Sequence, residues 1–168
     1  MPTPFDGLAI AQNLAALGFA VFPLRTRAKV PANLNGFKSA SRYLEDWQDE
    51  TGQWWQGRNR NCNVGIATGV EHPDGGYLTV IDIDRHPGKP DGFASWNAWR
   101  AGRPPMEQTM SVATPQGGLH LYFLSHEPMP TRTDIRPGID IKGVGGYVVG
   151  AGSIITLGDY VVATDVSP

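Results

Sequence analysis

An apolar, β-branched segment that ends in two aspartates constrains this chain more than any other feature. Residues 77–84 read YLTVIDID, and β-branched residues in such a run favour a strand. Because side chains alternate across a strand, Asp82 and Asp84 leave the same face, with their Cα atoms about 6.6 Å apart. The segment therefore predicts a strand that brings two carboxylates to one place.

Two ionised carboxylates in this position repel each other. The repulsion is about 3 kcal/mol at a separation of roughly 5 Å and an effective dielectric constant near 20. An otherwise apolar strand keeps such a pair if a counter-charge is bound, and Mg²⁺ or Mn²⁺ suits hard oxygen ligands. The alternative is a solvated pair that caps the next turn, and the Asp-x-Asp string alone does not decide between the two.

A histidine follows a glycine turn later in the chain. Residues 114–123 read TPQGGLHLYF, in which the two glycines predict a tight turn and His120 enters the strand after it. His120 shares its strand face with Tyr122, and the opposite face, which carries Phe123, is expected to pack into the core. His120 is then a candidate for phosphate contact or metal-adjacent chemistry. A purely structural histidine is the alternative.

A third segment, residues 136–150, reads RPGIDIKGVGGYVVG. Asp140 stands between two isoleucines on a predicted short strand, and Lys142 shares its face. An acid and a base side by side suit a metal–triphosphate site, with Asp140 on the metal and Lys142 on phosphate. A surface ion pair on an edge strand is the alternative. The glycines that follow match neither a P-loop nor a dinucleotide-binding fingerprint, because the Lys-Ser/Thr pair and the strand-to-helix context are missing.

The pattern of apolar residues predicts an α+β fold. The first half is mixed α/β, and the second half is a mostly antiparallel sheet joined by glycine- and proline-rich turns. A length of 168 residues fits one domain. The predicted helices are 6–17, 41–55 and 92–100, and the predicted strands are 19–24, 63–69, 77–84, 110–114, 119–124, 139–143, 146–152 and 159–164.

Composition sets limits on where the chain acts and on its partners. The net charge of −2 is unusual for a protein that binds nucleic acid, although basic residues cluster locally, as at 25–29. The single cysteine excludes an internal disulfide, and no apolar run reaches the roughly 18 residues of a membrane span. A reducing, cytoplasmic location and no membrane partner are expected.

The three segments, taken in order, resemble the motifs of the bifunctional primase/polymerase domain in the archaeo-eukaryotic primase superfamily. This domain stands at the N-terminus of many phage and plasmid replication proteins. Its Asp-x-Asp motif is matched by Asp82 and Asp84, its histidine after a glycine-rich turn by His120, and its apolar-Asp motif by Asp140. The second motif is usually Ser-x-His, and Gly118 stands here at the position of the serine.

The resemblance implies a two-metal DNA primase/polymerase. Two Mg²⁺ or Mn²⁺ ions would assist attack of a 3′-hydroxyl on an α-phosphate, with pyrophosphate leaving. The implied metal ligands are Asp82, Asp84 and Asp140, which form the catalytic set together with His120. The implied nucleotide contacts are His120 and Lys142, and Lys29 and Lys38 are weaker candidates for contact with the phosphates or with the template.

The resemblance also implies a fold and a set of partners. Residues 1–168 would form one catalytic domain, in which an N-terminal α/β unit packs on an RRM-like C-terminal unit and the active site lies in the cleft between them. Expected partners are a single-stranded DNA template, a primer strand, dNTPs or NTPs, and a helicase or ATPase domain further along a longer replication protein. A catalytically inactive nucleic-acid-binding module of the same fold is the alternative function. A nicking enzyme is disfavoured, because the segment around His120 lacks a second histidine.

Overall fold

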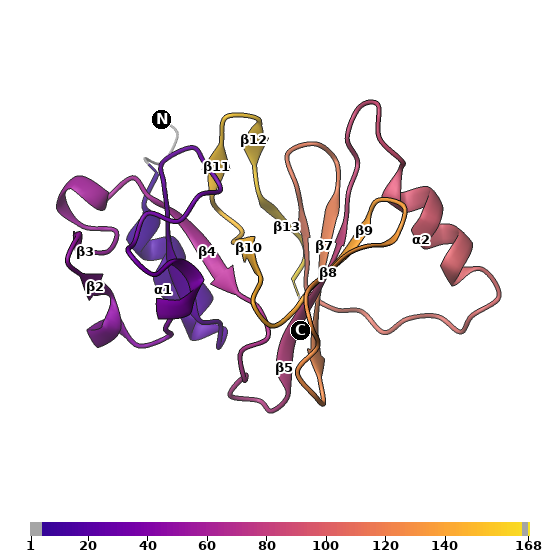
Figure 1. Ribbon diagram of the computed structural model, residues 1–168, viewed down its shortest axis with the longest axis horizontal. Coiled ribbons are helices and arrows are strands. Elements are labelled where there is room, and N and C mark those ends of the chain that lie inside the picture. Colours follow the sequence, from indigo (N-terminus) through magenta and orange to yellow (C-terminus); the bar gives the residue numbers. More distant parts are fainter. Residues whose placement is uncertain (1–4, 166–167) are drawn as a thin grey trace.

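A three-stranded and a six-stranded antiparallel sheet form the framework of residues 5–165 and 168, the part that the computed structural model describes (Figure 1). The smaller sheet has the order β1 (Val21–Leu24), β4 (Asn63–Ala67), β10 (Tyr147–Val149). The larger has the order β13 (Val161–Thr164), β6 (Ser111–Ala113), β7 (Leu119–Ser125), β5 (Tyr77–Ile83), β9 (Ile139–Lys142), β8 (Arg132–Arg136). Two short hairpins, β2 (Gln48–Asp49) with β3 (Gly52–Gln53) and β11 (Ile154–Ile155) with β12 (Gly158–Asp159), lie outside these sheets.

Two α-helices occur in the described part of the chain, and both were predicted. Helix α1 (Gly7–Ala16) is capped at its N-terminus by Asp6, whose side chain accepts a hydrogen bond from the amide of Ala9 at 3.1 Å. It packs on β1 and β4, whereas α2 (Gly92–Arg100) contacts β5 and β9 at the opposite end of the molecule (Figure 1). Neither helix is long and apolar enough to cross a membrane.

The predicted helix at residues 41–55 is wrong. The segment instead holds a short 3-10 turn, η2 (Leu44–Asp46), and the β2–β3 hairpin. The side chain of Asp49 accepts hydrogen bonds from the amide and the hydroxyl of Thr51, which favours a turn over a helix. The tryptophans of this segment, Trp47, Trp54 and Trp55, are all buried. Their burial overrides the helical spacing of the apolar residues.

The predicted strands are present, but the chain does not divide cleanly into halves. Strand β5 comes from the first half and lies inside the six-stranded sheet, whereas β10 comes from the second half and completes the three-stranded sheet. Strand β8, the β11–β12 hairpin and the other 3-10 turns, η1 (Gly36–Ser39) and η3 (Gly57–Asn59), were not predicted. The α+β class with antiparallel sheets is confirmed.

One hydrophobic cluster joins the two sheets. It contains Phe19 beside β1 and extends across to Leu78, Val80 and Tyr122 of the larger sheet. The rings of Phe19 and Tyr122 lie 5.6 Å apart, and both side chains are almost completely buried. The face of β5 that carries Leu78 and Val80 therefore packs against the N-terminal elements, and further along the strand the same face carries Asp82.

The contact between the sheets predicts the effect of truncating Phe19. Phe19→Ala removes a ring that is 1% exposed, so it is expected to lower the free energy of unfolding by about 3–5 kcal/mol. Urea denaturation followed by tryptophan fluorescence measures the change. Leu34→Ala is the control, because Leu34 is 63% exposed and its truncation should cost roughly 0.5 kcal/mol or less. Equal losses in the two variants would contradict a core shared between the sheets.

Candidate active site

Strand register brings the sequence-predicted residues of three separate segments into one row. Asp82 on β5 pairs with His120 on β7 on one side and with Asp140 on β9 on the other. Residues paired across antiparallel strands lie side by side on the same face. Asp84 follows Asp82 by two positions and completes the group at the end of the strand.

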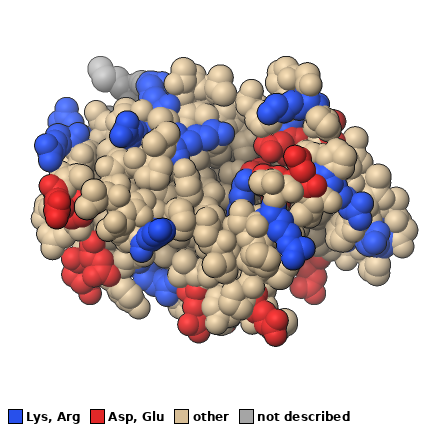
Figure 2. Space-filling view, in the orientation of Figure 1, with Lys and Arg blue, Asp and Glu red and all other residues tan. Residues whose placement is uncertain are grey.

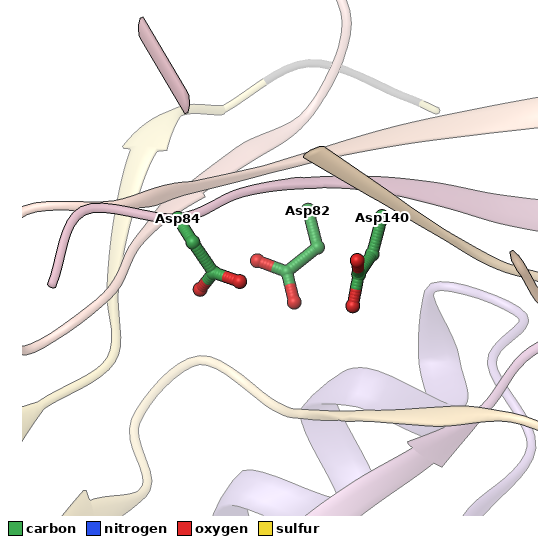
Figure 3. A group of neighbouring side chains, drawn as sticks. All are labelled: Asp82, Asp84 and Asp140. Carbon is green, nitrogen blue, oxygen red and sulfur yellow. The ribbon is translucent and has the colours of Figure 1, made fainter. Parts of the chain in front are cut away.

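The three carboxylates form a compact acidic triad of Asp82, Asp84 and Asp140. Each offers an oxygen, and these ligand atoms all lie within 4.8 Å of one another. Figure 3 shows the side chains leaving their strands on the same side. Burial raises the pKa of Asp82, an effect that the charge of Lys142 partly offsets. Burial, followed by the neighbouring charge of Asp82, also raises the pKa of Asp84. Three hard oxygen donors at this spacing suit a divalent cation such as Mg²⁺ or Mn²⁺.

Two contacts hold Asp140 in place. Its Oδ1 accepts a hydrogen bond from the amide of Asp134 at 2.8 Å, and its Oδ2 accepts one from Nζ of Lys142 at 2.7 Å. Asp134 has φ +48°, a left-handed conformation that side-chain-bearing residues seldom adopt, at an irregularity in the β8–β9 pairing. Burial alone would lower the pKa of Lys142, but the bond to Asp140 and the charge of Asp82 outweigh it and raise that pKa.

His120 is buried and neutral rather than an exposed cation. Its side chain is 6% exposed, and Nε2 lies 3.5 Å from Oδ1 of Asp82. Burial, followed by the charge of Lys29, lowers the pKa of His120 to about 3. The ring packs on Tyr160, with centroids 5.8 Å apart and an interplanar angle of 38°. Nδ1 has no hydrogen-bond partner in the described part of the chain.

The prediction about the two faces of β7 is only half right. The face of Phe123 was expected to pack and that of His120 to carry polar groups. Tyr122, on the His120 face, is completely buried in the main core, whereas Phe123 is partly exposed. The core therefore continues along the His120 face up to the acidic triad.

Two sizeable cavities border residues of the triad. One of about 340 Å³ borders Asp82 and is lined by Lys29, His120, Thr131, Lys142, Gly145, Gly146, Tyr147, Val148, Val149 and Tyr160. We call it the lysine cavity. Another of about 660 Å³ borders Asp84 and Asp140 and includes His86 and Lys89 in its lining. Figure 2 shows acidic side chains gathered beside a hollow on this face, with basic side chains around it.

The two N-terminal lysines proposed as phosphate contacts lie in different surroundings. Lys29 lines the lysine cavity, and its Nζ lies 5.9 Å from the ring centroid of Tyr160. The hydroxyl of Tyr147 donates to the backbone carbonyl of Lys29 at 3.0 Å, which fixes this loop against the cavity. Lys38 is exposed on η1 and is not among the residues that line the cavity.

Sequence reasoning missed three residues of the site. Tyr160 borders both Lys29 and His120, and Tyr147 holds the Lys29 loop. Nε2 of His86 lies 3.1 Å from Oδ1 of Asp84. The adjacency of His86 to the Asp-x-Asp string was the one local signal for it. Tyr147 lies on β10 and Tyr160 lies between β12 and β13, and no spacing in the sequence connects them with Lys29 or His120.

The glycine turn before His120 is required by close backbone contact. The amide of Thr114 bonds to the carbonyl of Gly118, and the amide of Gly117 bonds to the carbonyl of Thr114. A Cβ atom at Gly118 would lie 2.6 Å from the carbonyl oxygen of Ile83 and 2.8 Å from Oγ1 of Thr114. The glycine in place of the usual serine therefore lets the turn approach the end of β5.

The fold and the site together define a class of protein. It is a small α+β protein in which antiparallel strands assemble carboxylates suited to a metal, beside a cavity that contains lysines. The family described as "Bifunctional DNA primase/polymerase, N-terminal" matches residues 11–168, and the chain belongs to this family. The resemblance inferred from the sequence is thereby confirmed. No curated protein matches the chain in sequence.

Gly118→Ala tests the close contact at the turn. The added methyl group would press on the carbonyl of Ile83, so the free energy of unfolding is expected to fall by about 1–3 kcal/mol. Thermal unfolding followed by circular dichroism measures the loss. An unchanged melting temperature would show that the end of β5 shifts to make room for the methyl group and that a side chain is tolerated at residue 118.

Proposed function

We propose that this chain is a metal-dependent nucleotidyltransferase that synthesises or extends primers on a single-stranded DNA template from nucleoside triphosphates. Membership of the family supports the general activity. The main support for the choice of site residues is that Asp82 pairs with His120 on one neighbouring strand and with Asp140 on the other. The strand register thus brings residues of the three family motifs side by side. The bound nucleotide would occupy the lysine cavity, whose size lies within the usual range for small ligands.

The acidic triad is the proposed holder of the metal ions. Its carboxylate oxygens are close enough to share cations, and their partial burial limits competition from water. When bound, Mg²⁺ or Mn²⁺ polarises the phosphoryl oxygens and neutralises the charge that develops on the attacking and leaving oxygens.

The remaining residues bind and orient the triphosphate. Lys29 and Lys142 line the same cavity and supply positive charge for phosphate oxygens. A neutral His120 can direct one N–H at a phosphate oxygen without adding a charge. Tyr160 packs against the imidazole and limits its orientation. Lys38 stays a proposed contact for the template, since it is exposed away from the lysine cavity.

Strand order supports the proposed RRM-like unit. The run β5–α2–β6–β7–β9 places its first and third strands, β5 and β7, in the centre of the sheet, with β6 beside β7 and β9 beside β5. This is the arrangement of split β-α-β folds. The lining of the lysine cavity includes Tyr147 from the three-stranded sheet and Asp82 and His120 from the six-stranded sheet, together with Lys29 from the N-terminal loop. This lining supports an active site in a cleft between the N-terminal unit and the RRM-like unit.

Replacing the central carboxylate tests the proposed function. Asp82→Asn keeps the side-chain shape but removes the charge, and primer extension with labelled dNTPs and Mn²⁺ is expected to fall by a factor of roughly 100 or more. Asp74→Asn is the matched control, because the side chain of Asp74 is 74% exposed and pairs with His72 in a distant loop. Undiminished extension by Asp82→Asn would defeat the site assignment. A wild-type protein that binds no Mn²⁺ would favour the inactive nucleic-acid-binding module.

His120→Gln tests the role of the imidazole. Glutamine keeps a hydrogen-bonding group but loses the ring that packs on Tyr160, so a phosphate contact would be misplaced. The dissociation constant of a fluorescent dNTP is expected to rise about tenfold, which corresponds to about 1.4 kcal/mol. Affinity for single-stranded DNA, measured by anisotropy, should change little. Equal weakening of both ligands would indicate a structural role for His120.

A further inference from the structure

Lys142 lies where a cation is expected, between two members of the acidic triad. Its Nζ is 2.7 Å from Oδ2 of Asp140 and 3.7 Å from Oδ2 of Asp82. The side chains of Lys142, Asp82 and Asp140 are only 22%, 13% and 15% exposed, so water and salt screen these charges weakly. Partly buried carboxylates need a counter-charge, and the ammonium group supplies one.

The ammonium group of Lys142 occupies a carboxylate, that of Asp140, which also belongs to the candidate metal site. Oδ1 of that residue already accepts the amide hydrogen bond of Asp134 at 2.8 Å. Oδ2 accepts the hydrogen bond of Lys142 at 2.7 Å, so a metal that bound this carboxylate through Oδ2 would have to displace the ammonium group or lie against it. A divalent cation bound there would lie close to the ammonium group, and like charges at such distances repel strongly.

We propose that Lys142 is a built-in counter-ion that the metal displaces. Its ammonium group neutralises Asp82 and Asp140 in the metal-free protein, and it moves to the phosphates of the nucleotide when the metal binds. The proposal rests on the nucleotidyltransferase function proposed above and concerns the regulation of that same site.

The surroundings of Lys142 provide a place for the displaced group. The residue borders the lysine cavity, in which Gly145 and Gly146 present backbone without side chains. The lysine stem is flexible and can swing over a few ångströms. Lys29 does not serve as the counter-ion in the same way, since in the described residues the lysine within 4 Å of carboxylate oxygens of the triad is Lys142.

Displacement couples the two ligands. Without nucleotide, the metal must separate Lys142 from its carboxylates, which weakens metal binding. With a triphosphate present, the displaced ammonium group gains phosphate partners, so each ligand strengthens the binding of the other. The triad is thereby held in a neutralised state until metal and nucleotide are both available.

Mn²⁺ binding to the full chain tests this coupling without any measurement of activity. The EPR signal of unbound Mn²⁺ gives the dissociation constant with and without a nucleotide that has a non-hydrolysable α,β-bridge, once the Mn²⁺ bound by the same nucleotide in the absence of protein is subtracted. Lys142→Met removes the charge and keeps much of the stem. Without nucleotide, this variant is expected to bind Mn²⁺ at least about fivefold more tightly than the wild type, and the nucleotide should enhance its Mn²⁺ affinity less.

Two further variants serve as controls. Lys89→Met removes the same charge from an exposed residue in the cavity beside Asp84, and its Mn²⁺ affinity should match that of the wild type. Lys142→Arg keeps a cation and should keep the wild-type coupling. If Lys142→Met loses its cooperative thermal transition, Lys142→Gln replaces it in the same titrations.

The outcomes separate the two proposals. Mn²⁺ binding by Lys142→Met that is equal to or weaker than that of the wild type would overturn the counter-ion role and leave the nucleotidyltransferase function standing. Failure of both proteins to bind Mn²⁺, with and without nucleotide, would reject both proposals. If Lys89→Met and Lys142→Met bind Mn²⁺ more tightly than the wild type by the same factor, the gain is a general effect of removing a positive charge. That result would also overturn the counter-ion role of Lys142.

Discussion

The antiparallel register of β7, β5 and β9 is the constraint on which the candidate site depends. It sets Asp82 between His120 and Asp140, and a slip by one residue in either pairing would turn a motif residue to the opposite face of the sheet. Leu78 and Val80 fix the register, because they share the face of Asp82 and are fully buried in the core. The packing of apolar side chains thus determines where the charges lie.

The site is the place where the hydrophobic core gives way to acidic side chains on the same sheet face. Partial burial there raises the pKa of Asp82 and Asp84 and keeps His120 uncharged. Such an arrangement works against stability, because desolvated carboxylates in proximity repel one another. It favours the binding of a cation for the same reason, and Lys142 lessens the cost while no cation is bound.

Local patterns predicted most of the elements that carry the site. The β-branched run ending at Asp82 and Asp84 and the glycine turn before His120 are strong local signals, and both elements are present. The predicted helix at 41–55 is wrong because the burial of its tryptophans depends on distant parts of the chain. The neutral state of His120 could not be predicted from the sequence either, because it results from burial against Tyr160 and other residues remote in sequence.

The sequence by itself determined which chemical groups are available and in what order: three aspartates, a histidine behind a glycine turn, and lysines near them. Only the tertiary structure decided that β5 lies between β7 and β9, and that Lys29 and Tyr160, from opposite ends of the chain, border the same cavity. The physical reason is that strand order and sheet packing are set by the burial of apolar surface between distant segments. No local spacing of residues encodes that burial.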